Sequence, residues 1–405
     1  MRKLAYALLL CAATVQAQEP AAVTPPQLDE AQVAAIRAAV GNSGRTITNV
    51  TRDAYRNPEQ TLTFFGVTQL EKPNDPKLPL FVAVDLKGEI VWLYQDEETN
   101  HDRAARAIKV LDEDTLLLLA GDGFRTVSLA GDLQLQVSSG PQFGGTIHHD
   151  VVALSSGGFL VLGRDQREVE LEATGEMAVV KGDRVFELDE QGATVWEWST
   201  FDHLDPQHMP TSLSQKPNPK DGSYDWTHGN GLVVLEGGDF LLSMRHQHQV
   251  ARVSRDTGEV VWLLGDGGDF NLLEGQWFYG QHAPTLREDG TLLLYDNGND
   301  RPSGPPLFSR AVGYSLDVEA LTATETLSWT VPEYTSFLGG VQALPDDAAL
   351  ICAGGVRNAN GPDGATSGIG RLIEINKSGE EIWRLEVEGN MYRALRVEGL
   401  LWQDD

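Results

Sequence analysis

From about residue 61 onward, apolar and polar residues alternate with a period of two, which is the period of a β-strand that buries one face. Clusters of Gly, Asp, Asn and Pro separate the short apolar runs, and these residues are typical of tight turns. The spacing predicts a repeating unit of two hairpins, or about four short strands.

Two half-motifs mark the repeat. The first is Gly-x-x-x-Trp at residues 88–92, 131–135, 192–196, 258–262, 325–329 and 379–383, with Leu replacing Trp in the second copy and Glu replacing Gly in the fifth. The second is Leu, a short acidic or Gly-rich turn and an apolar strand, at residues 154–160, 235–241, 286–292 and 344–350. A unit of this size cannot bury both of its faces alone, so the units must stack radially and close into a ring. The pattern predicts an all-β fold, a six-bladed β-propeller, with the recurrent Trp in the core between blades.

The ends of the chain complete the domain assignment. The last strand-like run, residues 392–402, is expected to pair with residues 61–70 and join the first blade to the last. Before the repeats, residues 18–60 are expected to form a leader and a short N-terminal helical segment, because Val33, Ile36 and Val40 have helical spacing. The propeller domain is therefore assigned to residues 61–405.

Residues 1–17 have the features of a secretory signal peptide. Arg2 and Lys3 precede an apolar run, and small residues stand at the −3 and −1 positions of a cleavage site after Ala17. The run is too short for a stable membrane anchor. We therefore expect a periplasmic or secreted protein with no membrane anchor after cleavage.

Charge and cysteine content exclude several functions. The chain has 59 acidic residues against 31 Lys and Arg, a net charge of −28, which argues against nucleic acid as a partner. Cys352 is the only cysteine beyond the signal peptide, so no intrachain disulfide is expected. Cysteine chemistry and Cys-rich metal sites are excluded for the same reason.

Long polar excursions interrupt the repeats at residues 200–224, 297–307 and 354–368. Insertions in repeat proteins form loops, often on the binding face. The first excursion is a candidate lid over the central funnel.

Histidines gather near the repeats that carry these excursions, at His148, His149, His228, His246, His248 and His282. Four of them, His148, His149, His228 and His282, precede the second half-motif in successive blades, so they are expected to face the central channel together. One such histidine alone is more simply a packing residue, whereas three consecutive blades favour a site.

Three kinds of site use several imidazoles that face the same point: a metal site, a site of general acid–base catalysis and a site of nucleophilic catalysis. Metal binding is disfavoured here, because the neighbouring polar groups include the donors Arg245 and Asn230, and a cation does not favour a guanidinium beside it. General acid–base catalysis and nucleophilic catalysis both remain, and the fork of Arg245 suits two oxygens of a tetrahedral oxyanion in either case.

The residues around these histidines resemble the bacterial arylsulfotransferase family. The matching stretches are Ile147–Val151, Asp225–Asn230, Ser243–His246, Thr257–Gly265, Gln281–His282, Asp296–Gly298 and Ser309–Val312. They occur in the family's order and cover roughly residues 80–395. The resemblance implies a periplasmic six-bladed propeller that moves sulfuryl groups between phenols without a nucleotide sulfate donor. We expect no cofactor and no metal.

The resemblance also assigns roles. His282 would be the nucleophile that is transiently sulfated, and His228, Asn230 and Arg245 would bind the sulfuryl oxygens. One of His148 and His149 would protonate the leaving phenolate and deprotonate the incoming phenol. Partners would be an aryl sulfate donor and a phenolic acceptor, with the oligomeric state left open.

This chain departs from the family at a few positions. The family commonly has Ala where Gly229 stands, and the late-blade hydroxyl of some members has its nearest candidates in Thr366 and Ser367. The alternative function is a non-catalytic propeller that binds a sulfated or phenolic ligand, or a partner protein, at the same channel mouth.

Overall fold

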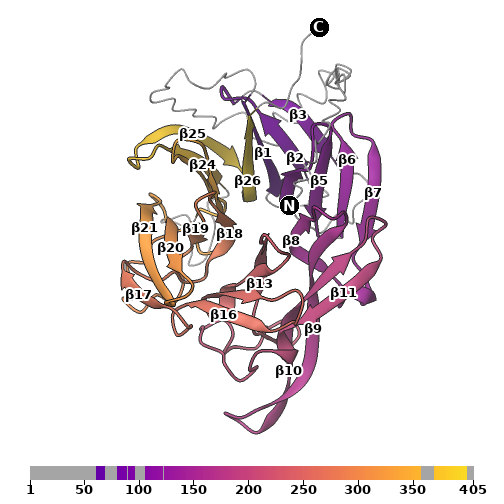
Figure 1. Cartoon of the computed structure of the whole chain (residues 1–405), viewed down its shortest axis with the longest axis vertical. Coiled ribbons are helices and arrows are strands. Elements are labelled where there is room, and N and C mark those ends of the chain that lie inside the picture. The colour runs from indigo at the N-terminus through magenta and orange to yellow at the C-terminus, as the bar shows by residue number, and fades with distance from the viewer. Residues whose placement is uncertain are drawn as a thin grey trace, which may run out of the picture.

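The structure, a computed structural model, describes residues 61–68, 80–88, 90–95, 105–121, 123–356 and 369–398. Within these ranges nearly every element is a β-strand, and the strands form six sheets arranged around a central axis (Figure 1). The predicted all-β, six-bladed propeller is confirmed. The predicted N-terminal helical segment lies outside the described residues.

The first three blades, numbered in chain order, are listed from the innermost strand outward. Blade 1 consists of β26 (Asn390–Glu398), β1 (Thr61–Thr68), β2 (Leu80–Val84) and β3 (Ile90–Gln95). Blade 2 consists of β4 (Ala107–Val110), β5 (Thr115–Ala120), β6 (Gly123–Ser128) and β7 (Leu133–Ser138). Blade 3 consists of β8 (Ile147–Ala153), β9 (Phe159–Leu171), β10 (Glu176–Leu188) and β11 (Thr194–Ser199), with β12 (Tyr224–Asp225) added parallel to β10.

The remaining blades follow the same plan. Blade 4 consists of β13 (Gly229–Val234), β14 (Phe240–Met244), β15 (Gln249–Val253) and β16 (Val260–Gly265). Blade 5 consists of β18 (His282–Leu286), β19 (Leu292–Asp296), β20 (Arg310–Asp317), β21 (Thr322–Thr330) and β17 (Asn271–Glu274). Blade 6 consists of β22 (Gly340–Ala343), β23 (Ala349–Ala353), β24 (Ile369–Ile375) and β25 (Glu381–Glu388). In the part of the chain that the structure describes, three single-turn 3₁₀ helices, η1 (Pro141–Phe143), η2 (Thr200–Asp202) and η3 (Arg245–Gln247), lie in loops.

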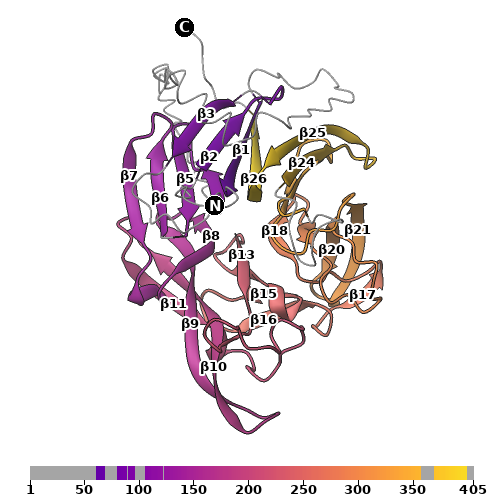
Figure 2. The same ribbon diagram turned by 180° about the vertical axis from the view of Figure 1, so that it is seen from behind.

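Ring closure follows the sequence prediction. β26 pairs antiparallel with β1. The last described strand is therefore the innermost strand of blade 1, whose other three strands are the first three of the described chain. Seen from behind, β26 again lies beside β1, on the side of blade 1 that faces blade 6 (Figure 2). Pairing the two ends of the domain in one sheet leaves no open edge between first and last blades.

The recurrent Trp residues link neighbouring blades, as predicted. Trp92 on β3 donates its indole N–H to Leu129 O in blade 2, and Trp383 on β25 donates to Leu86 O in blade 1, at 2.9 Å in each case. Both side chains are buried between sheets of apolar residues. Trp92 and Trp383 therefore each pack one blade against the next while keeping the polar N–H satisfied, whereas the indole N–H of Trp262 has no partner among the described residues.

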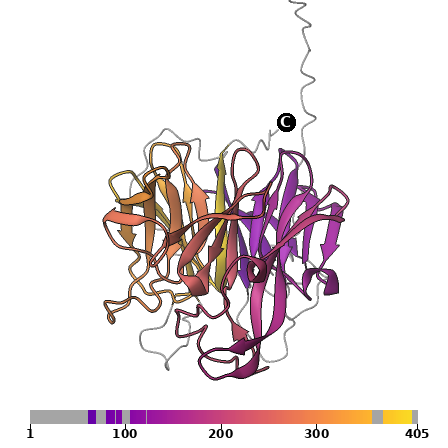
Figure 3. The same ribbon diagram turned by 60° about the horizontal axis from the view of Figure 1, so that its bottom comes forward.

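The inner strands β4, β8, β13, β18, β22 and β26 are successive neighbours around the axis. Because the sheets are antiparallel, the loops before the inner strands lie at the same end of the ring as the β9–β10, β14–β15 and β19–β20 loops. The excursions at residues 200–224 and 297–307 occupy this end, and the long β9–β10 hairpin projects past the other blades (Figure 3). This end carries the candidate site.

Candidate active site

The inner strands of blades 3, 4 and 5 are irregular at their beginnings. The pairing register shifts between Ile147 and Val151 in β8, between Gly229 and Gly231 in β13, and between His282 and Thr285 in β18. A non-glycine residue with positive φ lies within two of these irregularities, His149 at 60° and Ala283 at 49°, and His228 at 52° directly precedes the third. Such a conformation costs about 1–3 kcal/mol per residue, and it redirects the side chains beside it. The irregular starts bring the His149 and His228 ring centroids to 5.0 Å, and His149 and His282 both have Tyr392 as a ring neighbour.

His282 is buried and held by Asn297. Its Nδ1 lies 2.6 Å from Asn297 Oδ1, while Asn297 Nδ2 donates to Thr335 O at 2.8 Å and to Leu338 O at 2.9 Å. Because the amide nitrogen is committed to two carbonyls, Asn297 Oδ1 must accept, and His282 Nδ1 must carry the proton. The lone pair of His282 is therefore on Nε2, the atom that a nucleophilic imidazole uses. Burial and the nearby Arg245 charge hold the pKa of His282 well below its usual value.

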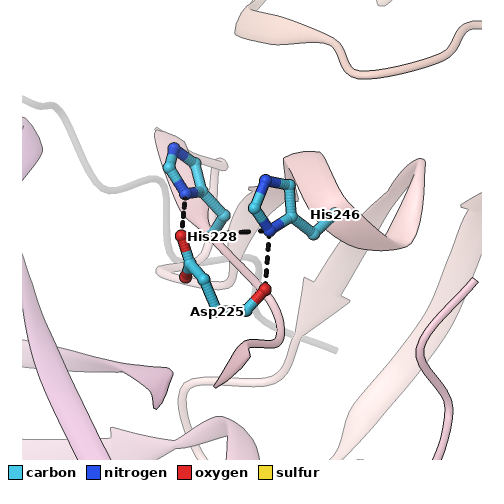
Figure 4. A group of neighbouring side chains, drawn as sticks. All are labelled: Asp225, His228 and His246. Atoms are coloured by element: carbon cyan, nitrogen blue, oxygen red, sulfur yellow. Dashed lines mark hydrogen bonds and ion pairs between the residues drawn. The ribbon is translucent and has the colours of Figure 1, made fainter. Parts of the chain in front are cut away.

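His228 and His246 share Asp225 as a partner (Figure 4). His228 Nδ1 lies 2.6 Å from Asp225 Oδ2, and His246 Nδ1 lies 2.6 Å from the main-chain oxygen of Asp225. Both oxygens can only accept, so both Nδ1 atoms carry protons and both Nε2 atoms are directed away from Asp225. Burial would raise the pKa of the Asp225 carboxyl, but the charge of His228 and its hydrogen bond lower it strongly.

Arg245 is positioned by groups on two blades. Its Nη1 donates to His246 Nε2 at 2.8 Å, and its Nη2 donates to Ser336 O at 3.0 Å. Because a guanidinium cannot accept, His246 must be neutral, in agreement with a pKa of about 3 that burial and the His228 charge produce. Arg245 Nε is buried and has no hydrogen-bond partner among the described residues. An unpaired buried donor beside the histidine cluster is suited to an oxyanion.

The structure separates His148 from His149. His149 faces the channel, with its ring centroid 5.0 Å from that of His228 and 5.8 Å from that of Tyr392. His148 lies behind it, with Nε2 3.1 Å from Gly163 O and its Nδ1 2.7 Å from His149 Nδ1. His149 is therefore the inward-facing member of the pair, a choice that the sequence left open.

A family model described as Arylsulfotransferase (ASST) matches residues 48–394, most of the chain. The chain belongs to the arylsulfotransferase family. An arylsulfotransferase is an enzyme whose donor is an aryl sulfate and whose acceptor is a phenol, so the predicted family and enzyme class are confirmed.

Other comparisons are more distant. A protein of unknown function from Bacteroides caccae aligns at 11% identity with a TM-score of 0.49, covering 84% of this chain and 99% of that one. The virginiamycin B lyase of Staphylococcus aureus with quinupristin aligns at 16% identity with a TM-score of 0.39, covering 70% and 71%. The comparison with curated proteins gives no match.

Among the described residues there is no helix with the length and hydropathy needed to cross a membrane.

Asn230 of this arylsulfotransferase is fully buried. Its Nδ2 donates to Gln281 O at 2.7 Å, directly before His282, and its main-chain oxygen accepts from Arg393 Nη2 at 2.6 Å and from Tyr392 Oη at 3.2 Å. The side chain therefore ties β13 to the start of β18. Its predicted contact with the sulfuryl group stays a prediction.

A metal ion is poorly suited to the cluster of Asp225, His228 and His246, although their ligand atoms lie within 4.8 Å of one another. A cation at Nδ1 of His246 would force the remaining proton onto Nε2, where Arg245 already donates. Arg164 also lies 3.4 Å from Asp225 Oδ1. The donor set of this arylsulfotransferase thus favours an anion over a metal ion.

Several residues of the site were not predicted. Tyr392 and Arg393 belong to the site only because β26 closes the ring. Asp183 lies on β10, next to the outermost strand of blade 3, and no sequence motif surrounds it. The predicted ring closure was the available signal for Tyr392. His248 accepts a hydrogen bond from Gly280 N at 2.8 Å and supports the loop before His282. Thr366 and Ser367 lie outside the described residues.

Proposed function

We propose that this arylsulfotransferase works by a ping-pong mechanism through a sulfohistidine at His282. In the first half-reaction, the Nε2 lone pair of His282 attacks sulfur, the bond between sulfur and the aryl oxygen breaks, and a phenol leaves. In the second, the oxygen of another phenol attacks the same sulfur, and the S–N bond breaks with its electron pair returning to Nε2. The observation that carries the proposal is the Asn297 hydrogen bond, which leaves Nε2 of His282 unprotonated.

The charges around His282 support transfer of an anionic group. Arg245 and His228 both lower the pKa of His282, so they lie within electrostatic reach of its ring. The unpaired Nε–H of Arg245 is placed to donate to a sulfuryl oxygen, and His228, whose Nδ1–H is held by Asp225, donates to another when its Nε2 is also protonated, with Asn230 as a further candidate. Donors fixed before the reaction stabilise the charge that develops on the transferring group.

His149 is our candidate for the proton transfer. In the second half-reaction, His149 takes a proton from the incoming phenol. When the next catalytic cycle begins, His149 gives this proton to the leaving phenolate, so no proton is gained or lost over one cycle. The ring is buried beside His228 and Tyr392. We further propose that the protein acts in the periplasm or outside the cell, because residues 1–17 have the pattern of a signal peptide.

The test is intact-protein and peptide mass spectrometry after mixing the enzyme with p-nitrophenyl sulfate and no acceptor. We expect a single sulfuryl adduct on His282, released when a phenol is added. His282→Asn should show no adduct, and His203→Asn, at an exposed histidine stacked on Trp198, should behave as the unmodified protein. Binding of aryl sulfates without adduct or phenol release would contradict the proposal and favour a binding module.

A further inference from the structure

A chain of three groups leads from the channel into blade 3. His148 Nε2 lies 3.1 Å from Gly163 O, to which it is hydrogen bonded, and 3.2 Å from Asp183 Oδ1. Both oxygens are acceptors, so this nitrogen carries the proton of neutral His148, and the His148 lone pair is on Nδ1. That lone pair lies 2.7 Å from His149 Nδ1, which must therefore donate. It follows that Nε2 of His149 holds a lone pair and is ready to accept a proton.

Asp183 is fixed in place at the end of this chain. It is fully buried, and its Oδ2 accepts from Thr227 Oγ1 at 2.5 Å and from Gly229 N. A Cβ at Gly229 would lie 2.9 Å from Asp183 Cγ, so glycine at this position permits the close approach. Burial would raise the pKa of Asp183, but the nearby His148 Nε2 and the Arg164 charge lower it to about 2, which keeps the carboxylate ionised.

Other charged and titratable groups also face the two histidines. Arg106, before β4, and Arg164, on β9, lower the pKa of both His148 and His149, and His228 lowers the pKa of His149. Tyr392 on β26 contacts the His149 ring. Asp183 is the anion closest to His148, so it is the group that would balance a proton arriving on this pair.

We propose that His148 and Asp183 form a relay that stabilises the positive charge of His149 when it takes the phenol proton. The inference rests on the proposed function, because it concerns the acid–base step of that reaction. The phenol O–H bond breaks and its proton bonds to His149 Nε2. The Nδ1–H of His149 then strengthens its hydrogen bond to His148 Nδ1, and the Asp183 carboxylate balances the charge at His148 Nε2. His148 is thus a positioning residue that acts through His149.

The decisive experiment separates steps that need a proton from steps that do not. His148→Gln keeps hydrogen-bonding groups but cannot be charged, and His148→Phe removes both properties. Sulfation of His282 by p-nitrophenyl sulfate releases a stable phenolate, so its rate in His148→Gln should stay within about threefold of the unmodified enzyme. Transfer to phenol, which must lose a proton, should fall about 10- to 100-fold. At pH 8, acceptor phenols whose hydroxyl group is already ionised have no proton to lose, so His148→Gln should transfer the sulfuryl group to them as fast as the unmodified enzyme does.

A structural role would give a different result. In that case His148→Gln would match the unmodified enzyme or lose both half-reactions equally, and the loss would not depend on the acceptor's pKa. Either pattern would overturn the relay. The absence of any His282 adduct in the unmodified enzyme would contradict the proposed function instead.

A second measurement does not depend on activity. ¹⁵N NMR of histidine-labelled protein should place the proton of His148 on Nε2 and that of His149 on Nδ1. A proton on Nδ1 of His148 would contradict the relay even if His282 is sulfated.

Discussion

The inner strands of blades 3, 4 and 5 differ from those of blades 2 and 6. β4 and β22 pair with their neighbours in unbroken register. β8, β13 and β18 shift register at their beginnings, where His149, His228 and Ala283 adopt positive φ. The regular strands and the outer Trp residues bury apolar surface and hold the ring together. The irregular starts store strain and direct imidazoles to the axis, which is the expected division between a stable scaffold and a reactive site.

The largest expected effect is on the scaffold. Trp383→Ala removes a fully buried indole and its hydrogen bond to Leu86 O across the joint between blades 6 and 1. We expect the free energy of unfolding to fall by about 3–5 kcal/mol, measured by urea denaturation. Trp383→Phe should lose less. Both variants should sulfate His282 at the normal rate under folding conditions, and a specific loss of chemistry would show that scaffold and site are not separable in this way.

The next effect concerns the site alone. Arg245→Lys keeps the charge but loses the fork that contacts both His246 and Ser336. We expect kcat/KM for p-nitrophenyl sulfate to fall about 10²- to 10³-fold with little change in the urea midpoint. Arg252→Lys, at a surface pair with Asp239 in the same blade, is the matched control and should keep full activity. An Arg245→Lys enzyme with normal kinetics would exclude this guanidinium as a sulfuryl-binding group.

The buried histidines of the site also make the free energy of unfolding depend on pH. Burial lowers the pKa values of His148, His149, His246, His248 and His282, to about 3 for His246 and about 4 for His248. Between those values and about 6.5, the unfolded chain binds more protons than the folded one, so stability must fall as pH falls through this window. We expect a loss on the order of a few kcal/mol between pH 6.5 and pH 4, measured by urea denaturation at each pH.

One substitution sharpens that pH test. Asn at position 248 accepts the Gly280 N–H in place of His248 and tolerates its φ of 55°, but it does not titrate. His248→Asn should therefore weaken the pH dependence while keeping the fold. An unchanged slope would show that His248 does not contribute to it.

The sequence predicted the parts of the molecule that repeat. The Gly-x-x-x-Trp spacing gave six blades, and the pairing of the last strand with residue 61 onward followed from the need to close the ring. The predicted convergence of four histidines holds for His149 and His228, whose ring centroids lie 5.0 Å apart, but not for His148, which is directed to Gly163 O and Asp183. The blade count and the ring closure were predicted correctly because they depend on periodicity, which local sequence contains.

What the sequence could not supply were contacts made where the repeat breaks. The choice between His148 and His149 depends on the irregular start of β8, which brings the Nδ1 atoms of two nearly perpendicular neighbouring rings to 2.7 Å from each other. Asp183 reaches the turn of His228 from another blade, and no motif surrounds it. Such contacts depend on the relative placement of blades, which strand patterns do not determine.

The smallest expected effect is that of removing metal ions, which should leave the rate of turnover unchanged. This experiment tests whether the histidines at the irregular strand starts are arranged for an anion. Overnight dialysis against EDTA should leave turnover unchanged, because the Nδ1 protons of His228 and His246 bond to Asp225 and the His246 lone pair accepts from Arg245. A divalent cation bound through Nδ1 of His246 would have to break that last contact and lie near two guanidinium groups. Activity that disappears on dialysis and returns with a divalent metal would mean that these tautomers are wrong, and that the cluster binds a cation where we infer an anion.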